Sequence, residues 1–194
     1  MRLFVAIEID KTVRDRIDKT VRDRIEKTRK QLRLEIALPK GAVKWVESEN
    51  THLTLIFLGD AADNRVMEVC RIVEEMAVSH SAFELEIKGL GTFGRPARVV
   101  WVGITENPAL KALQTDLRGA FEKADWPVEN RGFSGHLTLC RVKVPSAGDA
   151  LRRKVEAMPV ETFGTSFAES VCVFESQLSG AGPVYAVIRR AMLK

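Results

Sequence analysis

The sequence predicts an α+β fold with two pseudo-symmetric lobes of mainly antiparallel strands and flanking helices around a central cleft. A length of 194 residues, with 45% hydrophobic and 29% charged side chains, suffices for one generous core. Segments typical of strands and of helices alternate along the chain, and the tetrapeptide HLTL occurs once in each half, at 52–55 and 136–139. Because neither half has enough apolar surface for its own core, we expect residues 1–194 to form a single two-lobed domain.

The chain begins with a segment, residues 2–9, whose apolar and β-branched side chains predict a buried strand. A tandem duplication follows, KTVRDRID at 11–18 and KTVRDRIE at 19–26. Its apolar positions fall on one narrow face of a helix: Val13, Ile17, Val21, Ile25 and Leu32. We expect the repeat to lengthen a solvated surface helix by about two turns. Nucleic-acid binding by its arginines is the alternative, but nearly every arginine has an acidic neighbour.

The remaining elements follow from the same periodicities and from turn residues. In the first half we expect strands at 42–47 and 52–59, a helix capped by Asp60 and ending near Val78, and strands at 83–91 and 97–104. In the second half we expect a helix from Pro108 to Ala124, a strand at 136–142, a short helix near 147–157, and terminal strands at 166–176 and 183–193.

Composition excludes several classes of protein. No apolar run approaches the roughly 18–20 residues that would span a bilayer, and the apolar stretch at the N-terminus is too short for a signal peptide. The three cysteines, Cys70, Cys140 and Cys172, are odd in number and far apart, which indicates neither a disulfide framework nor a zinc site. A reducing cytoplasm fits this pattern. The net charge of +4 mildly favours anionic partners.

The repeated tetrapeptide is the strongest chemical signal. Strand alternation places His52 and Thr54 on one face, and His136 and Thr138 do the same in the second motif. If the two halves face each other, two imidazoles and two hydroxyls converge on a volume that suits a phosphate. The hydroxyls donate hydrogen bonds to its oxygens, while one imidazole removes a proton and the other supplies one, with no metal required. For a single motif, local polar contacts are the better explanation of the histidine and threonine. The duplication of the motif in matching strands favours catalysis instead. His80 lacks this context and is expected to be a surface or capping residue.

The chain resembles the two-histidine phosphoesterase superfamily, and most closely its 2′-5′ RNA ligase group, also called RNA 2′,3′-cyclic phosphodiesterases. The similarity covers nearly the whole chain through MRLFVAIEI, VKWVESENTHLTLIFLGD, GTFGRPARVVWVGI and HLTLCRV. The resemblance implies hydrolysis of a terminal 2′,3′-cyclic phosphate on RNA to a 2′-phosphate without a cofactor. It assigns His52 as the acid and His136 as the base, with Thr54 and Thr138 holding the phosphate.

Two positions depart from the family pattern. Ile56 stands where many members carry a basic residue, and Gly135 stands where many carry proline. A cation at position 56 would lie on the face of His52, so another residue must neutralise the phosphate. Arg141 matches an arginine that commonly follows the second motif. Strict alternation, however, places its side chain on the other face of the strand from His136. Phe133 matches an aromatic that precedes the motif, where it stacks a base or belongs to the core.

Two alternatives remain open. The ligase direction joins a 2′,3′-cyclic phosphate to a 5′-hydroxyl and would use the same acid and base in reverse. A non-catalytic RNA- or nucleotide-binding module would keep the fold without turnover, although the intact motifs argue against it. The expected partner is RNA with a 2′,3′-cyclic phosphate end, such as a tRNA fragment, or a small cyclic nucleotide. We expect a monomer that does not associate with membranes.

Overall fold

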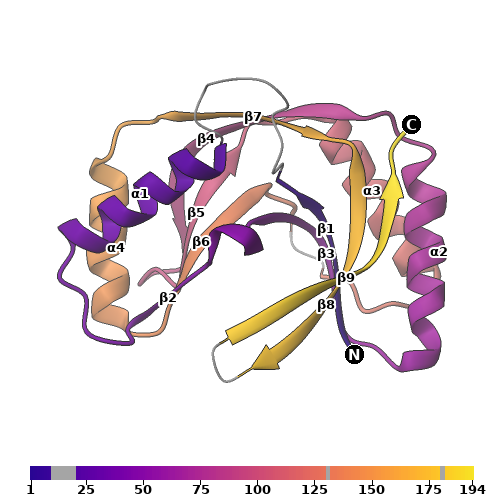
Figure 1. The fold of residues 1–194 in the computed structure, drawn as a ribbon, viewed down its shortest axis with the longest axis horizontal. Helices are drawn as coiled ribbons and strands as arrows, with labels where there is room; N and C mark the ends of the chain where they lie inside the picture. Colours follow the sequence, from indigo (N-terminus) through magenta and orange to yellow (C-terminus); the bar gives the residue numbers. More distant parts are fainter. Residues whose placement is uncertain (10–20, 130–131, 180–181) are drawn as a thin grey trace.

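The structure, a computed structural model, describes residues 1–9, 21–129, 132–179 and 182–194 (Figure 1). Its strands are β1 (Arg2–Glu8), β2 (Val43–Trp45), β3 (His52–Asp60), β4 (Phe83–Phe93), β5 (Val99–Ile104), β6 (His136–Val142), β7 (Thr162–Ala168), β8 (Ser170–Ser179) and β9 (Gly182–Met192). Its helices are α1 (Val21–Glu35), α2 (Val66–Ala77), α3 (Pro108–Lys123) and α4 (Pro145–Ala157), with short 3-10 turns η1 (Ser48–Asn50) and η2 (Asp63–Arg65). The predicted mixture of helices and antiparallel strands is confirmed.

All nine strands belong to one antiparallel sheet with the order β7-β4-β5-β6-β3-β1-β8-β9, and β2 pairs with β6. The sheet divides at the junction of β6 with β3 into two lobes. Helices α1 and α4 lie with β4 to β7, whereas α2 and α3 lie with β1, β3, β8 and β9 (Figure 1). The lobes do not correspond to the two halves of the sequence, because each lobe takes segments from both.

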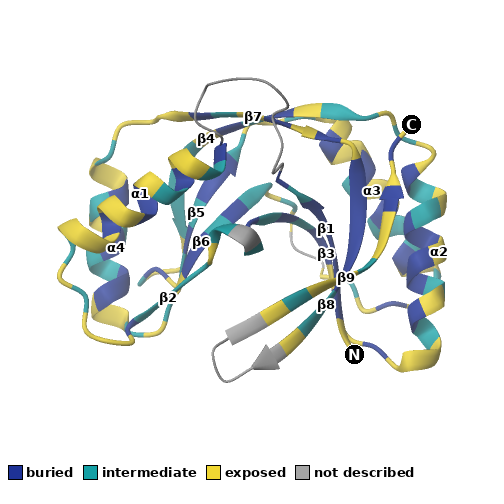
Figure 2. Ribbon diagram, viewed as in Figure 1, coloured by how far each residue is buried: buried dark blue, intermediate teal, exposed yellow. Residues whose placement is uncertain are grey.

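Each lobe buries the sheet face that its helices cover (Figure 2). We call the opposite face the inner face, and the register of the strands places both motif histidines on it. Along β1, Leu3, Val5 and Ile7 belong to the main core, while Phe4 and Ala6 form a smaller cluster on the inner face. This alternation follows from the two-residue period of a strand. Part of the inner face is therefore apolar.

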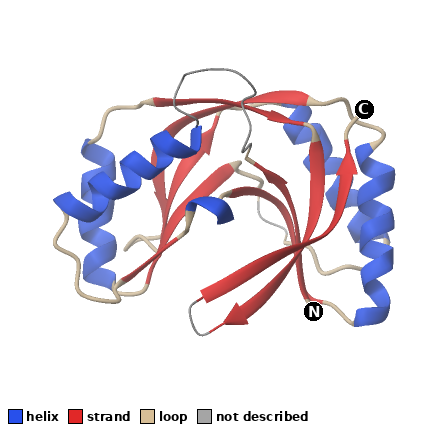
Figure 3. Cartoon of the chain, in the orientation of Figure 1, coloured by secondary structure: helices blue, strands red, loops and turns tan. Residues whose placement is uncertain are grey.

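The helices, which lie on the outside of the sheet (Figure 3), have recognisable sequence causes. Asn107 caps α3 by accepting a hydrogen bond from the backbone N–H of Leu110 at 3.0 Å, and Pro108 occupies the first turn, where its missing N–H costs nothing. In α1, the predicted apolar positions Val21, Ile25 and Leu32 are buried. The first copy of the repeat, with Val13 and Ile17, lies outside the described residues. None of the helices in the described segments is long and apolar enough to cross a membrane.

Several predicted boundaries are wrong. Asp60 does not cap a helix, because it is the last residue of β3 and α2 starts only after the turn η2. The predicted strand 166–176 is two strands broken at Glu169, and they pair with opposite parts of the sheet, β7 with β4 and β8 with β1. The predicted strand 42–47 shortens to β2, and the helix near 147–157 begins two residues earlier at Pro145.

Candidate active site

The two HLTL segments lie side by side at the junction of the lobes. Leu53 of β3 pairs with Leu137 of β6 in antiparallel register. One residue to either side of this pair, an antiparallel register sets His52 opposite Thr138 and Thr54 opposite His136. The local symmetry axis passes between the two leucines, and this register places each motif histidine across from the threonine of the other motif.

Each motif histidine is held by the same backbone bond. Nδ1 of His52 lies 2.7 Å from the carbonyl oxygen of Asn50, and Nδ1 of His136 lies 2.8 Å from that of Ser134. A carbonyl can only accept, so both Nδ1 atoms donate. In the neutral rings this leaves Nε2 as a proton acceptor, and in the protonated rings Nε2 becomes the donor. Each imidazole is thus fixed in one tautomer with its reactive nitrogen available.

A matching β-bulge follows each motif. In β6, Trp101 pairs with Thr138 but Val100 pairs with Cys140, so β6 carries one extra residue. The bulge buries both Leu139 and Cys140 and brings Arg141 onto the inner face. The prediction that Arg141 lies on the other face of β6 from His136 is therefore wrong.

A bulge in β3 changes the face on which the side chain of Ile56 lies. Ala6 pairs with Thr54 and Val5 pairs with Ile56, which buries Ile56 in the main core. The expectation that a side chain at position 56 shares the face of His52 is wrong, because a strand with one extra residue loses its strict alternation. Phe57 takes that place instead, at the position equivalent to Arg141. One motif thus continues into an aromatic side chain and the other into a cation.

Aromatic rings enclose His52. The ring centroid of Phe4 lies 4.9 Å from that of the imidazole, Tyr185 meets it edge-on at 5.2 Å, and Phe174 lies at 5.9 Å. Burial among these rings lowers the pKa of His52 to about 4, and the positive charge of Arg141 acts in the same direction. Hydrogen bonding to Asn50 opposes the shift without reversing it. His52 is therefore neutral at pH 7 in the unliganded protein.

His136 has its own aromatic neighbours. The ring of Phe93 lies edge-on at 4.8 Å between centroids, and that of Trp101 lies at 6.4 Å. A Cβ added to Gly91 would come within 2.2 Å of the Trp101 ring, so the indole lies directly against the backbone of β4. Burial also lowers the pKa of His136, with a further contribution from Arg141.

The other predicted phosphate ligands are available for binding. In the part of the chain that the structure describes, neither the hydroxyl of Thr54 nor that of Thr138 has a hydrogen-bond partner in the protein, and Arg141 has no ion-pair partner. The charge of Arg141 acts on both motif histidines and on Tyr185. It therefore lies near enough to the two imidazoles to supply a positive charge for the phosphate.

The structure separates three other positions from this group. Phe133 is half-buried and packs against the main core, which matches its alternative as a core residue. Gly135 is crowded, because an added Cβ would lie 3.2 Å from Cβ of Ile104. His80 is half-buried, and its Nε2 lies 3.0 Å from the exposed carboxylate of Asp116 on α3.

Sequence reasoning missed Glu8 and the aromatic enclosure. Glu8 pairs with His52 in the register of β1 with β3, and its carboxylate forms an ion pair with Arg190 of β9. Its negative charge raises the pKa of His52, as the smallest of the named contributions. Strand alternation places Phe4 and Glu8 on one face of β1, but that this face meets His52 depends on the pairing of β1 with β3. The sequence near β1 contains no signal that β8 pairs with this strand.

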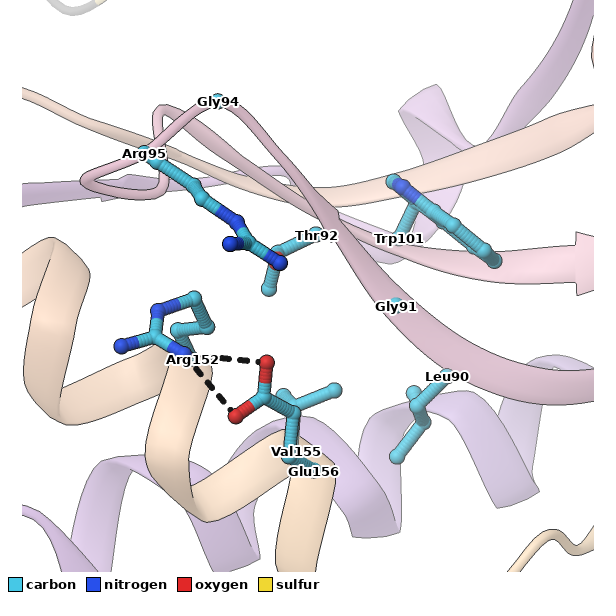
Figure 4. Close-up of a pocket in the computed structure, with 9 residues that line it drawn as sticks. All are labelled: Leu90, Gly91, Thr92, Gly94, Arg95, Trp101, Arg152, Val155 and Glu156. Carbon is cyan, nitrogen blue, oxygen red and sulfur yellow. Dashed lines mark hydrogen bonds and ion pairs between the residues drawn. The ribbon is translucent and has the colours of Figure 1, made fainter.

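A pocket of about 480 Å³ opens between β4 and α4, mainly on the side of the sheet that α4 covers. It lies at the edge of β4 and is lined by Leu90, Gly91, Thr92, Gly94, Arg95, Trp101, Arg152, Val155 and Glu156 (Figure 4). The segment GLGTFG at 89–94 has the spacing of a dinucleotide-binding loop, but it forms the end of β4 and the turn to β5. Such a loop needs a helix after the strand, so this segment is not one.

No group of three or more histidine, cysteine, aspartate or glutamate side chains that could hold a metal ion occurs among the described residues. The three cysteines are free and buried. Burial raises the pKa of the Cys140 thiol to about 12 and that of Cys172 to about 11, so both stay protonated and inert at neutral pH.

Comparison with known proteins agrees with this geometry. A model of the 2′-5′ RNA ligase superfamily matches residues 17–168. An RNA 2′,3′-cyclic phosphodiesterase of Methanothermobacter thermautotrophicus is 32% identical over 187 residues, covering 95% of each chain. One of Archaeoglobus fulgidus is 31% identical and covers 97% of this chain and 98% of its own.

Solved structures show the same architecture. The crystal structure of the Thermus thermophilus protein TT0787 is 25% identical, with a TM-score of 0.79 over 100% of this chain and 98% of its own. Escherichia coli LigT, solved with 3′-AMP, is 25% identical, with a TM-score of 0.74 over 99% of this chain and 97% of its own. The family model, the full-length relatives and the shared fold agree, and the chain belongs to the 2′-5′ RNA ligase superfamily.

Proposed function

We propose that the protein is an RNA 2′,3′-cyclic phosphodiesterase that opens a terminal 2′,3′-cyclic phosphate to a 2′-phosphate. The observation that carries the proposal is the antiparallel pairing of the two HLTL segments at Leu53 and Leu137, with both imidazoles held through Nδ1. Full-length relatives named RNA 2′,3′-cyclic phosphodiesterase support it.

The reaction needs one base, one acid and anion binding. His136 takes a proton from a water molecule through Nε2, and the resulting nucleophile attacks phosphorus in line with the 3′-oxygen. The bond from phosphorus to the 3′-oxygen breaks, and Nε2 of His52 protonates that oxygen. Thr54, Thr138 and Arg141 hold the non-bridging oxygens, where negative charge grows in the transition state.

Substrate binding must supply the proton that the free site lacks. Burial and Arg141 lower the pKa of both imidazoles in the unliganded protein. An anionic phosphate between them favours the charged form of an imidazole and so raises its pKa. One proton therefore enters with the substrate, and the site reaches its working state of one neutral and one protonated ring only when the phosphate is bound.

The test is turnover of an oligoribonucleotide that ends in a 2′,3′-cyclic phosphate, with the position of the product phosphate read by chromatography. We expect a 2′-phosphate product, and a loss of about 10²–10⁴ in rate for His52→Ala or for His136→Ala. His80→Ala is the matched control, because that histidine pairs with Asp116 on α3, away from the motifs. A 3′-phosphate product, or full activity in both motif variants, would refute the proposal.

The remaining assignments are finer parts of the same proposal. The substrate is RNA with a cyclic phosphate end, such as a tRNA fragment, or a small cyclic nucleotide, and the protein acts as a single-domain monomer. The free thiols support a reducing cytoplasmic location. A non-catalytic binding module would bind the same RNA without any product, so the turnover assay also separates this alternative.

A further inference from the structure

Two cations face each other where β2 pairs with β6. Lys44 is the register partner of Arg141, and opposed side chains in an antiparallel pair lie on one face of the sheet, about 5 Å apart between Cβ atoms. Val43 and Trp45, on either side of Lys44, pack against the main core. Because successive side chains of a strand alternate, Lys44 lies on the inner face, the same face as the motif histidines.

Nothing within the protein compensates these two charges. Like charges directly opposite each other in a sheet are destabilising. Neither Lys44 nor Arg141 has an ion-pair partner among the residues that the structure describes. Arg190, by contrast, forms an ion pair with Glu8 and is not free to bind an anion. Two unpaired cations at this spacing therefore indicate an anionic ligand on the inner face.

The two cations differ in their distance from the motifs. Arg141 lowers the pKa of both motif histidines, whereas Lys44 is not among the charges that act on them. On β5, the partner of Thr138 is Trp101 and the partner of Arg141 is Val99, two residues further along, which is about 7 Å. One nucleotide of an extended RNA strand covers a similar length. Lys44 is thus placed for the phosphate next to the reacting one.

The direction of the leaving group selects the same edge of β6. In the proposed reaction the 3′-oxygen departs toward His52, so the ribose of the terminal nucleotide lies on the side of β3. β2 and β3 both pair with β6 at the edge away from β5. Along this edge, the next phosphate can lie beside β2, with Lys44, or beside the far part of β3, with Phe57. An anion is bound by the lysine and not by the aromatic ring.

We propose that Lys44 binds the phosphate that joins the terminal nucleotide to the rest of the RNA strand. This subsite rests on the proposed function, because it extends the same bound strand by one phosphate. It favours an RNA end over a small cyclic nucleotide, which has no second phosphate. The ion pair is made equally in the bound substrate and in the transition state, so it lowers KM and leaves kcat unchanged.

The experiment isolates the charge of this phosphate. Three substrates with the same reacting group are compared: adenosine 2′,3′-cyclic phosphate, the dinucleotide ApA with a 2′,3′-cyclic phosphate end, and the same dinucleotide with an uncharged methylphosphonate linkage. We expect Lys44→Gln to raise KM for the ordinary dinucleotide about five- to tenfold at low salt, between the effects of an exposed ion pair and of a charge-assisted hydrogen bond. KM for the other two should not change, because both lack the second negative charge.

Lys30→Gln is the matched control, because it removes one positive charge from an exposed position of α1, which lies over the other face of the sheet. It should leave all three KM values unchanged. Lys44→Gln also removes a like-charge pair, so its urea midpoint should be no lower than that of the unmodified protein. A lower midpoint would show that Lys44 has a stabilising partner within the protein and would overturn the subsite.

Two kinetic outcomes would overturn the subsite and leave the proposed function standing. One is an unchanged KM for the ordinary dinucleotide in Lys44→Gln. The other is an equal loss with all three substrates, because Lys44 would then act on the cyclic phosphate itself. An unmodified protein that opens none of the three substrates would end both proposals.

Discussion

His52 should make the protein less stable in acid, and replacing it with glutamine should remove part of that loss. The pKa of the imidazole is about 4 in the folded protein, because the surrounding rings of Phe4, Phe174 and Tyr185 disfavour its charged form. In the unfolded chain a histidine has a pKa of about 6.5. As the pH falls below about 6.5, the unfolded state therefore binds a proton that the folded state excludes.

The sign and the size follow from this difference. Stability from the neutral, buried ring is fully present above about pH 6.5, is lost as the pH falls toward 4, and does not decrease further below it. The whole shift corresponds to about 3 kcal/mol, and the loss between pH 7 and pH 4.5 is about 2 kcal/mol. In His52→Gln no group titrates at this position. Carboxylates elsewhere contribute equally to both proteins and cancel in the comparison.

Equilibrium urea unfolding near pH 7 and near pH 4.5, followed by tryptophan fluorescence, measures the free energy of unfolding of each protein. The unmodified protein should lose about 2 kcal/mol more than His52→Gln between these conditions. His136→Gln is the matched variant, because the ring makes the same backbone bond but is less enclosed, and the difference should be smaller. Equal losses in His52→Gln and the unmodified protein would show that the aromatic enclosure does not exclude the proton.

Three further predictions follow from the site. The pH profile of kcat/KM should be bell-shaped with limbs below the ordinary histidine range, since both imidazoles have lowered pKa values, and EDTA should have no effect; restoration of activity by zinc after EDTA would contradict this. With a 3′-thio cyclic phosphate, whose leaving group has a pKa near about 8.5, His52→Ala should recover much of its rate and His136→Ala should not; the opposite rescue, read in single turnovers, would exchange the two roles. Gly91→Ala should displace the Trp101 indole, shift the tryptophan fluorescence and cost about 1–3 kcal/mol in unfolding, whereas Gly119→Ala, with open space around its Cβ, should cost nothing.

The histidines and threonines of the candidate site could be predicted because the repeated tetrapeptide HLTL can be found from the sequence alone. Alternation alone correctly places His52 with Thr54 and His136 with Thr138, since all four precede the bulges. It fails within three residues after each threonine. A β-bulge depends on how a neighbouring strand pairs, and that information is absent from the bulged segment itself.

The strand pairing could not be predicted for a related reason. Residues 166–176 have the composition of one continuous strand, yet they divide at Glu169 between two parts of the sheet. The partners, β4 and β1, are distant in sequence, so local propensity carries no information about them. The aromatic enclosure of His52 depends on this pairing, because it brings Phe174 and Tyr185 beside Phe4. The aromatic residues that lower the pKa of His52 could therefore not be predicted from the sequence, although His52 itself could.

The interleaving of the two lobes limits how this protein can be divided by engineering. The chain passes from β1 in one lobe to α1 in the other and returns at β3. It crosses again before β4, crosses to α3 and back between β5 and β6, and crosses a last time after β7. A gene fragment that encodes either HLTL segment with its sequence neighbours therefore lacks strands of its own lobe. Chimeras that exchange one lobe between relatives require a junction at every crossing, and a single cut would graft pieces of both.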